Sequence, residues 1–158
     1  MPIKSFRGKI GAGITNVQTI SLHTNDGSIG YRIKKFELIA EKPATTDFKH
    51  VVKIYKVPQS EVNGTIDFSD NTLLAVGFTK GDVEEYQAGY DNIIFDNETF
   101  NQDIYITAIE AKGNLECNYY IELEMVKLAL DENTVATLKD IRNLERDSTV
   151  TLTWNNII

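Results

Sequence analysis

The chain contains a single cysteine, Cys117, among its 158 residues. One thiol forms no disulfide within the chain and supplies no multi-cysteine metal site, so the composition fits synthesis in a reducing, intracellular compartment. The N-terminal residues lack the apolar run of a signal peptide, and no apolar stretch approaches the roughly 20 residues that cross a bilayer. From these absences we expect a soluble protein that is not secreted by the usual route and does not enter a membrane.

Positive charge is also scarce, because Lys and Arg together number 16 against 23 Asp and Glu, which gives a formal net charge of −7. Such a chain is a poor nucleic-acid binder, since that affinity comes from pairing phosphates with Lys and Arg. Residues 1–25 hold Lys4, Arg7 and Lys9 and no acid, so this segment carries +3 and the other 133 residues carry −10. The basic segment is either a solvated tail or an arm that lies on an acidic neighbour, for example another copy of the protein.

Most segments with clear periodicity have apolar residues at every second position. In residues 48–55, Phe48, His50, Val52 and Ile54 alternate with more polar positions, and residues 102–111 and 117–130 repeat the pattern. Residues 30–40 change phase by one residue across Lys34 and Lys35, as a β-bulge would cause. Turn-forming residues separate these runs at Asn25–Gly27, Asn63–Gly64 and Lys112–Asn114. The sequence therefore predicts an all-β, single-domain antiparallel β-sandwich, jelly-roll-like, over residues 18–146.

The two ends are predicted to differ from this body. Residues 1–17 contain three glycines, Gly8, Gly11 and Gly13, and are predicted to form a flexible basic arm. Asp131 is placed to cap one short helix, in which Val135, Leu138, Ile141 and Leu144 share a face. Residues 147–158 are predicted to form a C-terminal strand and tail, in which Val150, Leu152 and Trp154 alternate with threonines. That strand pairs either with an edge of its own sheet or with a neighbouring subunit.

No pattern in the chain indicates a reactive centre, and we predict no catalytic, cofactor-binding or metal-binding residue. The polar stretch at residues 95–107 and the cluster Asp67, Asp70 and Asn71 lack the spacing of a calcium loop and fit turns between strands. His50, Cys117 and Asp103 supply the residue types of a nucleophilic set, but no local signature accompanies them. A structural role is the simpler interpretation of all three.

Four segments carry a resemblance to a known group of proteins: residues 50–55, 95–107, 118–124 and 134–143. In them, and over residues 15–145 as a whole, the chain resembles small acidic virion structural proteins of tailed phages, particularly marine ones. The resemblance implies a non-enzymatic particle component without cofactors, made in the host cytoplasm and incorporated in the virion. Within that class we expect a capsid decoration protein that forms a homo-oligomer, preferably a trimer, and binds the major capsid protein.

Two other roles remain open at this level. One is a tail, neck or host-binding component of the same particle. The other is a carbohydrate-binding module in which Tyr86, Tyr90 and Trp154 line a groove. The candidate assembly residues are those of the two ends, namely Lys4, Arg7, Lys9, Val150, Leu152 and Trp154.

Overall fold

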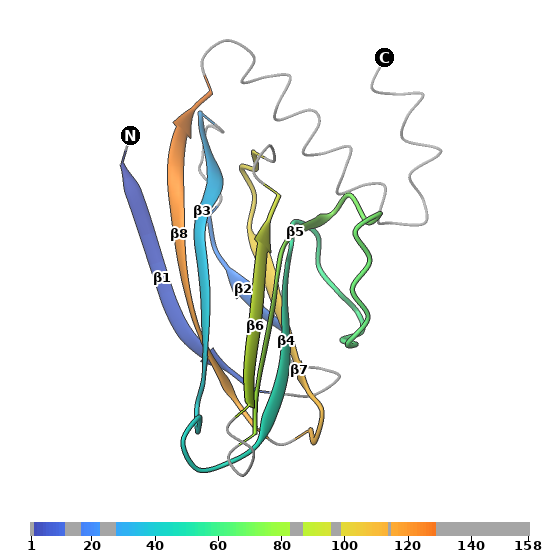
Figure 1. Cartoon of the computed structure of the whole chain (residues 1–158). Helices are drawn as coiled ribbons and strands as arrows, with labels where there is room; N and C mark the ends of the chain where they lie inside the picture. Colours follow the sequence, from blue (N-terminus) through green and yellow to red (C-terminus); the bar gives the residue numbers. More distant parts are fainter. Residues whose placement is uncertain are drawn as a thin grey trace.

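The computed structural model describes residues 2–11, 17–22, 28–82, 87–95, 99–113 and 115–128, which contain strands, turns and bends but no helix (Figure 1). The strands are β1 (Ile3–Ile10), β2 (Val17–Ile20), β3 (Ile29–Ala40), β4 (Phe48–Tyr55), β5 (Leu73–Asp82), β6 (Gln87–Ile94), β7 (Ile104–Glu110) and β8 (Cys117–Lys127). The helix predicted after Asp131 and the strand predicted near the C-terminus lie outside the described residues.

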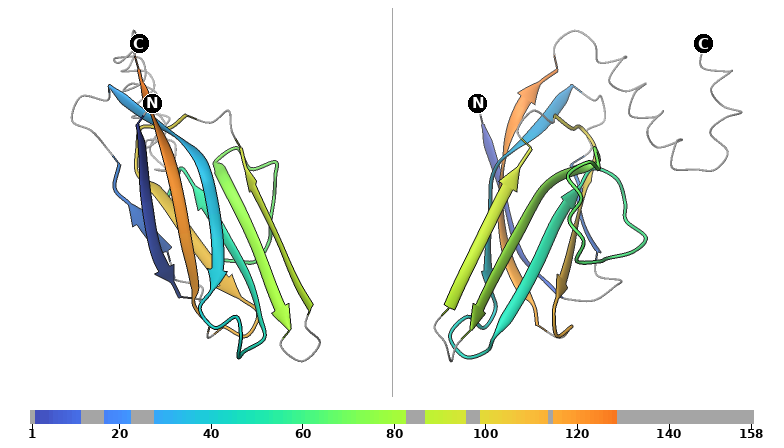
Figure 2. Two further views of the ribbon diagram at one scale, coloured as in Figure 1. Left: turned by 60° about the vertical axis from the view of Figure 1, so that its left-hand side comes forward. Right: turned by 45° about the vertical axis from the view of Figure 1, so that its right-hand side comes forward.

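The strands form two antiparallel sheets. A three-stranded sheet has the order β1-β8-β3, and a five-stranded sheet has the order β2-β7-β4-β5-β6. The two views in Figure 2 show the sheets facing each other along most of their length. The chain is therefore all-β with two facing sheets, which confirms that level of the sequence-based prediction.

One hydrophobic core fills the space between the sheets. Its members come from both layers and include Phe36, Ile54, Ile106, Ile121 and Leu123, each at most 2% exposed. Period-two alternation explains the arrangement, because His50, Val52 and Ile54 on β4 all face inward while Lys49 faces solvent. Burial of such side chains stabilises a fold by about 25 cal/mol per Å² of apolar surface.

The phase change predicted in β3 is confirmed. The register of β3 against β8 shifts between Ile33 and Lys35, at the position where the apolar alternation slips by one residue. The extra residue lets Ile33 and Phe36 both face the core, where they are 4% and 2% exposed.

The N-terminal segment differs from its prediction. Residues 3–10, expected to belong to a flexible arm, form strand β1, which pairs with β8 from Ile3 opposite Glu124 to Ile10 opposite Cys117. Gly8 is not a hinge, because a Cβ at this position would lie 2.7 Å from the Tyr119 hydroxyl. The glycine lets the aromatic side chain pack against the backbone of β1.

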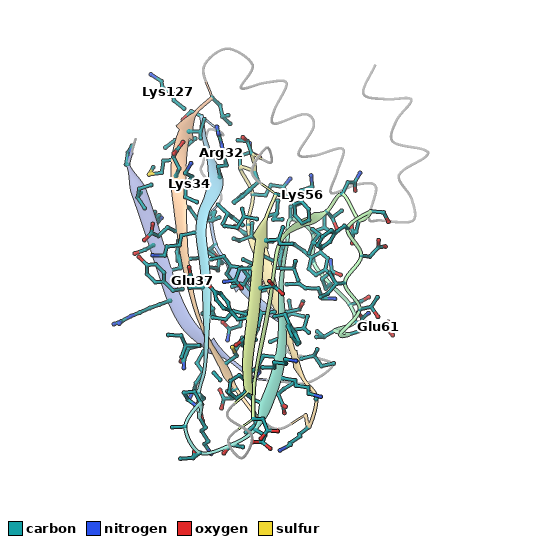
Figure 3. The ribbon with its side chains drawn as sticks, in the orientation of Figure 1. Arg32, Lys34, Glu37, Lys56, Glu61 and Lys127 are labelled. Carbon is teal, nitrogen blue, oxygen red and sulfur yellow. The ribbon has the colours of Figure 1, made fainter. Side chains whose placement is uncertain are left out.

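Residues 56–72 also differ from expectation. The predicted turn at Asn63–Gly64 does not join two strands but lies within one long loop between β4 and β5, marked by Lys56 and Glu61 in Figure 3. Val57 and Val62 are buried, at 7% and 4% exposure. The loop therefore packs on the protein and covers part of the outer face of the five-stranded sheet.

Candidate functional site: the seam between β3 and β6

An open seam separates two strand edges on one side of the molecule. Among the described residues, β3 has β8 as its only ladder partner and β6 has β5, although Tyr31 near the start of β3 also forms an isolated antiparallel bridge with Phe100 on the other edge. Strands β3 and β6 approach each other from opposite sheets, but they do not pair with each other. Unpaired strand edges offer backbone donors and acceptors to another segment, so this seam is the first candidate for binding.

The seam holds two adjoining hollows of about 420 and 460 Å³. Both are bordered by Glu37 and Tyr90, so they form one elongated groove. The first hollow is mainly polar; its lining consists of Lys34, Lys35, Phe36, Glu37, Tyr90, Asp91, Asn92 and Ile94. The second has a more apolar lining that includes Leu38, Ala40, Pro43 and Phe48. Figure 3 labels Lys34 and Glu37, which lie along β3.

The Asn92 side chain, which lines the first hollow, bridges the seam. The Asn92 Nδ2 group on β6 donates a hydrogen bond of 2.8 Å to the Phe36 carbonyl oxygen on β3. Gly77 on β5 makes room for this bridge, since a Cβ there would lie 2.6 Å from Leu38 Cδ1 and 2.8 Å from Asn92 Oδ1. The bridge fixes how closely the edges approach and satisfies one carbonyl of the free β3 edge.

Tyr90 gives the seam its most exposed aromatic surface. It pairs with Thr79 on β5, whose side chain faces the core, so the Tyr90 ring points toward the three-stranded sheet. Nothing in the described residues covers the ring, which stays 61% exposed. Of the aromatic residues predicted to line a carbohydrate groove, Tyr90 thus lies in a groove, whereas Tyr86 and Trp154 fall outside the described residues.

The second candidate is the outer edge strand β1, which carries the basic residues singled out in the sequence. Lys9 forms ion pairs with Glu41 at 2.8 Å and Glu116 at 4.0 Å, and the pairing raises the pKa of Lys9 and lowers that of Glu41. The acidic neighbour of Lys9 therefore belongs to its own chain. Lys4 lies over the Phe6 ring at 5.6 Å. Within the described residues, neither Lys4 nor Arg7 forms an ion pair, and both are exposed.

The structure separates the three residues of the conceivable nucleophilic set. His50 lies opposite Glu110 at the end of β7, whereas Asp103 precedes the first residue of β7 and accepts a 2.8 Å hydrogen bond from the Leu22 amide. Seven residues of extended chain place them about 23 Å apart. Burial raises the pKa of the Cys117 thiol to about 12, which leaves it protonated and unreactive near neutral pH. The three side chains form no common site.

The sequence analysis considered His50 but missed the buried carboxylate beside it. His50 and Glu110 face each other at 1% and 3% exposure, and burial lowers the pKa of His50 although the nearby carboxylate opposes the shift. The Glu110 carboxylate accepts hydrogen bonds from the amides of Lys112 at 3.0 Å and Lys49 at 3.4 Å. It thereby fastens the turn after β7 to the start of β4.

Lys53 is a further buried titratable group that the sequence analysis missed, and it lies beneath the 56–72 loop. Its Nζ donates hydrogen bonds to the Thr65 carbonyl at 2.7 Å and to Asn63 Oδ1 at 3.2 Å, and it lies 5.7 Å from the Tyr55 ring centre. Burial lowers the pKa of Lys53, while Asp70 acts in the opposite direction. A lysine on the outer face of a strand is expected to be exposed to solvent. Lys53 is buried only because the 56–72 loop folds over it, so the local sequence contains no signal for its burial.

The acidic clusters act as turn caps where they are described. Asp67 Oδ1 accepts hydrogen bonds from the amide and hydroxyl of Ser69, and Asp70 Oδ1 accepts them from the amide and hydroxyl of Thr72. These bonds lower the pKa of Asp67. Asn101 and Gln102 are buried, while residues 96–98 lie outside the described part. Within the described ranges, no three His, Cys, Asp or Glu side chains gather as a metal site would require.

Comparisons with known proteins do not identify a relative, so the interpretation depends on the residues described above. No family model matches the chain, and no curated protein matches it. A search for helices that are long and apolar enough to span a bilayer found none in the described part of the chain. Val150, Leu152 and Trp154 of the candidate assembly set lie beyond residue 128, outside the described residues.

Proposed function

We propose that this chain is a non-enzymatic structural protein of a phage virion, namely a capsid decoration protein that binds the head shell from outside. The strand order supports a jelly roll: β1-β8-β3 faces β2-β7-β4-β5, the nested order of two Greek keys, and β6 extends the second sheet. Viral capsid domains and lectins both use this fold, so the support is a fold-level analogy joined to the resemblance of the four segments.

The observation that carries the proposal is the exposed edge strand β1. It has eight residues, and within the described residues its only ladder partner is β8. Ile3 is 51% exposed at one end of the strand, and Lys4 and Arg7 lie on the same edge strand. Proteins usually cover or interrupt a long free edge of this kind, because it pairs readily with another chain. A subunit-to-shell contact is one use for such an edge.

The mechanism needs no reaction pocket. Backbone groups of β1 supply ladder hydrogen bonds to the major capsid protein, and Lys4 and Arg7 pair with acidic side chains of that partner. Lys9 is already engaged by Glu41 and keeps β1 attached to its own sheet. Binding to the assembled shell stabilises it by mass action, since the contact is lost when shell subunits separate. A symmetric shell also explains a homo-oligomer, with a trimer preferred at threefold positions.

Cosedimentation with expanded empty capsids tests this proposal. The full chain is expected to pellet with capsids in a saturable manner, and the double variant Lys4→Ser/Arg7→Ser is expected to bind at least about tenfold more weakly at low salt. Lys49→Ser/Lys112→Ser is the matched control, because it removes the same charge from two exposed lysines away from β1, one on β4 and one in the turn after β7. If the full chain does not pellet, or both double variants weaken binding equally, the β1 contact is rejected.

Tyr90 favours carbohydrate binding, in a host-binding or tail component, as the second candidate. An exposed aromatic ring beside Asp91, Asn92 and Lys34 in an elongated groove has the components of a sugar subsite. Titration with glycans would then give a saturable change in intrinsic fluorescence that Tyr90→Ala abolishes. A decoration protein gives no such change, so the two assays separate the candidates.

A further inference from the structure

Strand β6 lacks the features that usually protect an edge strand. Among the described residues β5 is its only ladder partner, and the eight residue pairs of that ladder follow one another without a register shift. Natural edges commonly carry lysine, proline or a bulge, because an unprotected edge pairs readily with another strand. Strand β3 has two lysines at its bulge, whereas the β6 sequence QAGYDNII contains no lysine, arginine or proline. Strand β6 is therefore open to a further strand.

The free side of β6 has backbone hydrogen-bonding groups at every second residue. The Phe95 amide donates a 3.0 Å hydrogen bond to the Leu74 carbonyl, so the backbone groups of Phe95 point toward β5. Because these groups alternate between the two sides of an antiparallel strand, those of Ala88, Tyr90 and Asn92 point away from β5. Within the part of the chain that the structure describes, no strand pairs with this side. An extended strand placed there would satisfy these donors and acceptors.

Side chains on both faces of β6 are also uncovered. Tyr90 faces the three-stranded sheet and is 61% exposed, whereas Ile93 faces the opposite way and is 41% exposed. The left view of Figure 2 shows β6 at the outer edge of the five-stranded sheet. A strand beside β6 would therefore remove apolar surface from water on both faces of the sheet.

We propose that a second copy of this chain supplies the added strand, so that two β6 strands pair antiparallel across a twofold axis at Tyr90. In this register Tyr90 lies opposite Tyr90 of the second copy, and Ala88 of each copy lies opposite Asn92 of the other. The paired strands exchange about six ladder hydrogen bonds, and the two five-stranded sheets become one continuous sheet. Such an isologous contact is the commonest kind in soluble homo-oligomers.

Charge complementarity favours a second copy and this register. Asp91 is the only charged residue of β6, and in a pairing centred at Tyr90 it lies opposite Gly89 of the second copy. Lys80 extends across Gly89 of its own chain, since a Cβ at position 89 would lie 3.1 Å from Lys80 Cε. The Asp91 carboxylate of each copy therefore meets the Lys80 ammonium group of the other, and the symmetry forms this ion pair twice. A pairing centred at Asp91 would instead place two carboxylates opposite each other.

This contact goes beyond the proposed function and leaves the β1 edge available for it. Strand β1 lies at the far edge of the other sheet, separated from β3 by β8. In solution the pairing of β6 gives a dimer, whereas the trimer proposed above depends on the threefold positions of a shell. On such a shell a twofold contact joins subunits of neighbouring trimers. The dimer is measured on the isolated chain, so this inference and the capsid proposal fail separately.

Sedimentation equilibrium on the full chain provides the first test, and a dimer with twice the chain mass of 17.8 kDa is expected. Asp91→Lys and Lys80→Asp each place like charges at the contact and are each expected to weaken dimerisation at least about tenfold at low salt. An equimolar mixture of the two variants is expected to restore the dimer, because each variant supplies the charge that the other lacks. Lys49→Asp is the matched control and is expected to dimerise normally, since Lys49 lies opposite Lys80 on β4, two strands away from the contact.

The mixture separates association from folding, because a folding defect in either variant is not repaired by adding the other. An unmodified chain that stays monomeric from micromolar to millimolar concentration overturns the proposal, as does a trimer. A mixture that dimerises no better than either variant alone also overturns it.

A cysteine at the axis tests the register. Twofold-related Cα atoms at position 90 lie about 5.5 Å apart, within the range of a disulfide, whereas those at position 88 lie roughly 14 Å apart. Mild oxidation is expected to link Tyr90→Cys into a covalent dimer and to leave Ala88→Cys unlinked, while the buried Cys117 reacts in neither variant. Linkage in neither variant, or faster linkage at position 88, refutes pairing centred at Tyr90.

Discussion

Gly77→Ala tests whether the approach of the two sheets at the seam is fixed as tightly as the distances indicate. A Cβ at position 77 would lie 2.6 Å from Leu38 Cδ1, 2.8 Å from Asn92 Oδ1 and 3.0 Å from Phe36 Cε2. The first two contacts are closer than a Cβ atom tolerates and the third is tight, so the Leu38 side chain, the Asn92 side chain or β3 itself must move. Movement of Asn92 or of β3 breaks or stretches the hydrogen bond from Asn92 to Phe36.

The magnitude follows from three contributions. Inserting a methyl group into a well-packed core costs about 1–3 kcal/mol. Loss of one hydrogen bond of this kind costs about 1 kcal/mol. Replacing glycine by alanine restricts the unfolded chain and offsets about 0.4–1 kcal/mol. We therefore expect Gly77→Ala to lower the free energy of unfolding by about 2 kcal/mol, which corresponds to about 4–8 °C in Tm for a domain of this size.

Urea denaturation at pH 7.5 measures this change, and Gly64→Ala provides the matched control. A Cβ at position 64 meets only Ile109 Cγ2 at 3.6 Å, an ordinary contact, so the control is expected to match the unmodified chain or to gain up to about 1 kcal/mol. Leu38→Val removes the atom nearest to the new methyl group and is expected to restore about 1 kcal/mol when combined with Gly77→Ala. A Gly77→Ala protein as stable as the unmodified chain refutes the close approach of β3 and β5.

Three further predictions concern the buried groups. Because burial lowers the pKa of His50, the unfolded chain binds a proton below about pH 6.5 that the folded chain does not. The free energy of unfolding is therefore expected to fall as the pH falls below that value, by at most about 1.4 kcal/mol per pH unit. Urea midpoints across pH 5–8 measure this slope, which is expected to be shallower in His50→Gln. Cys117 is expected to react with a thiol reagent at pH 8 only in urea, since burial raises its pKa to about 12; rapid modification of the native chain contradicts this. Lys53→Met is expected to expose the 56–72 loop to limited proteolysis at least about tenfold faster, whereas Lys49→Met, an exposed lysine on the same strand, leaves the rate unchanged.

Periodicity predicted the elements that have one buried face. The inward positions of β4 and the bulge in β3 are both visible in the sequence, because apolar side chains alternate there and slip at Lys34–Lys35. Strand β1 was missed for the same reason: its inward positions are Lys4, Phe6, Gly8 and Ile10, which show no apolar alternation. An edge strand tolerates such positions, since only part of its inner face reaches the core.

The candidate site depends on tertiary contacts that no local pattern encodes. The sequence indicated Tyr90 as an exposed aromatic residue but gave no sign that its neighbours belong to β3, more than fifty residues earlier in the chain. The same holds for Lys53, whose burial depends on a loop that begins after the strand has ended. These features follow from which segments meet, and that is decided by the packing of the complete core.

The pairing of β1 with β8 has a consequence for how the chain folds during synthesis. Ile3 lies opposite Glu124, and β8 stands between β1 and β3 in the three-stranded sheet. Neither neighbour finds its ladder partner until β8 has left the ribosome, which at about 5–20 residues per second is several seconds or more after β1 has emerged. Contacts this distant in sequence also slow folding, because the closure of a long loop precedes the gain from pairing. The nascent chain thus presents β1 and β3 as unpaired strands for most of its synthesis, and a chaperone that binds extended apolar segments has its longest opportunity at these two sites.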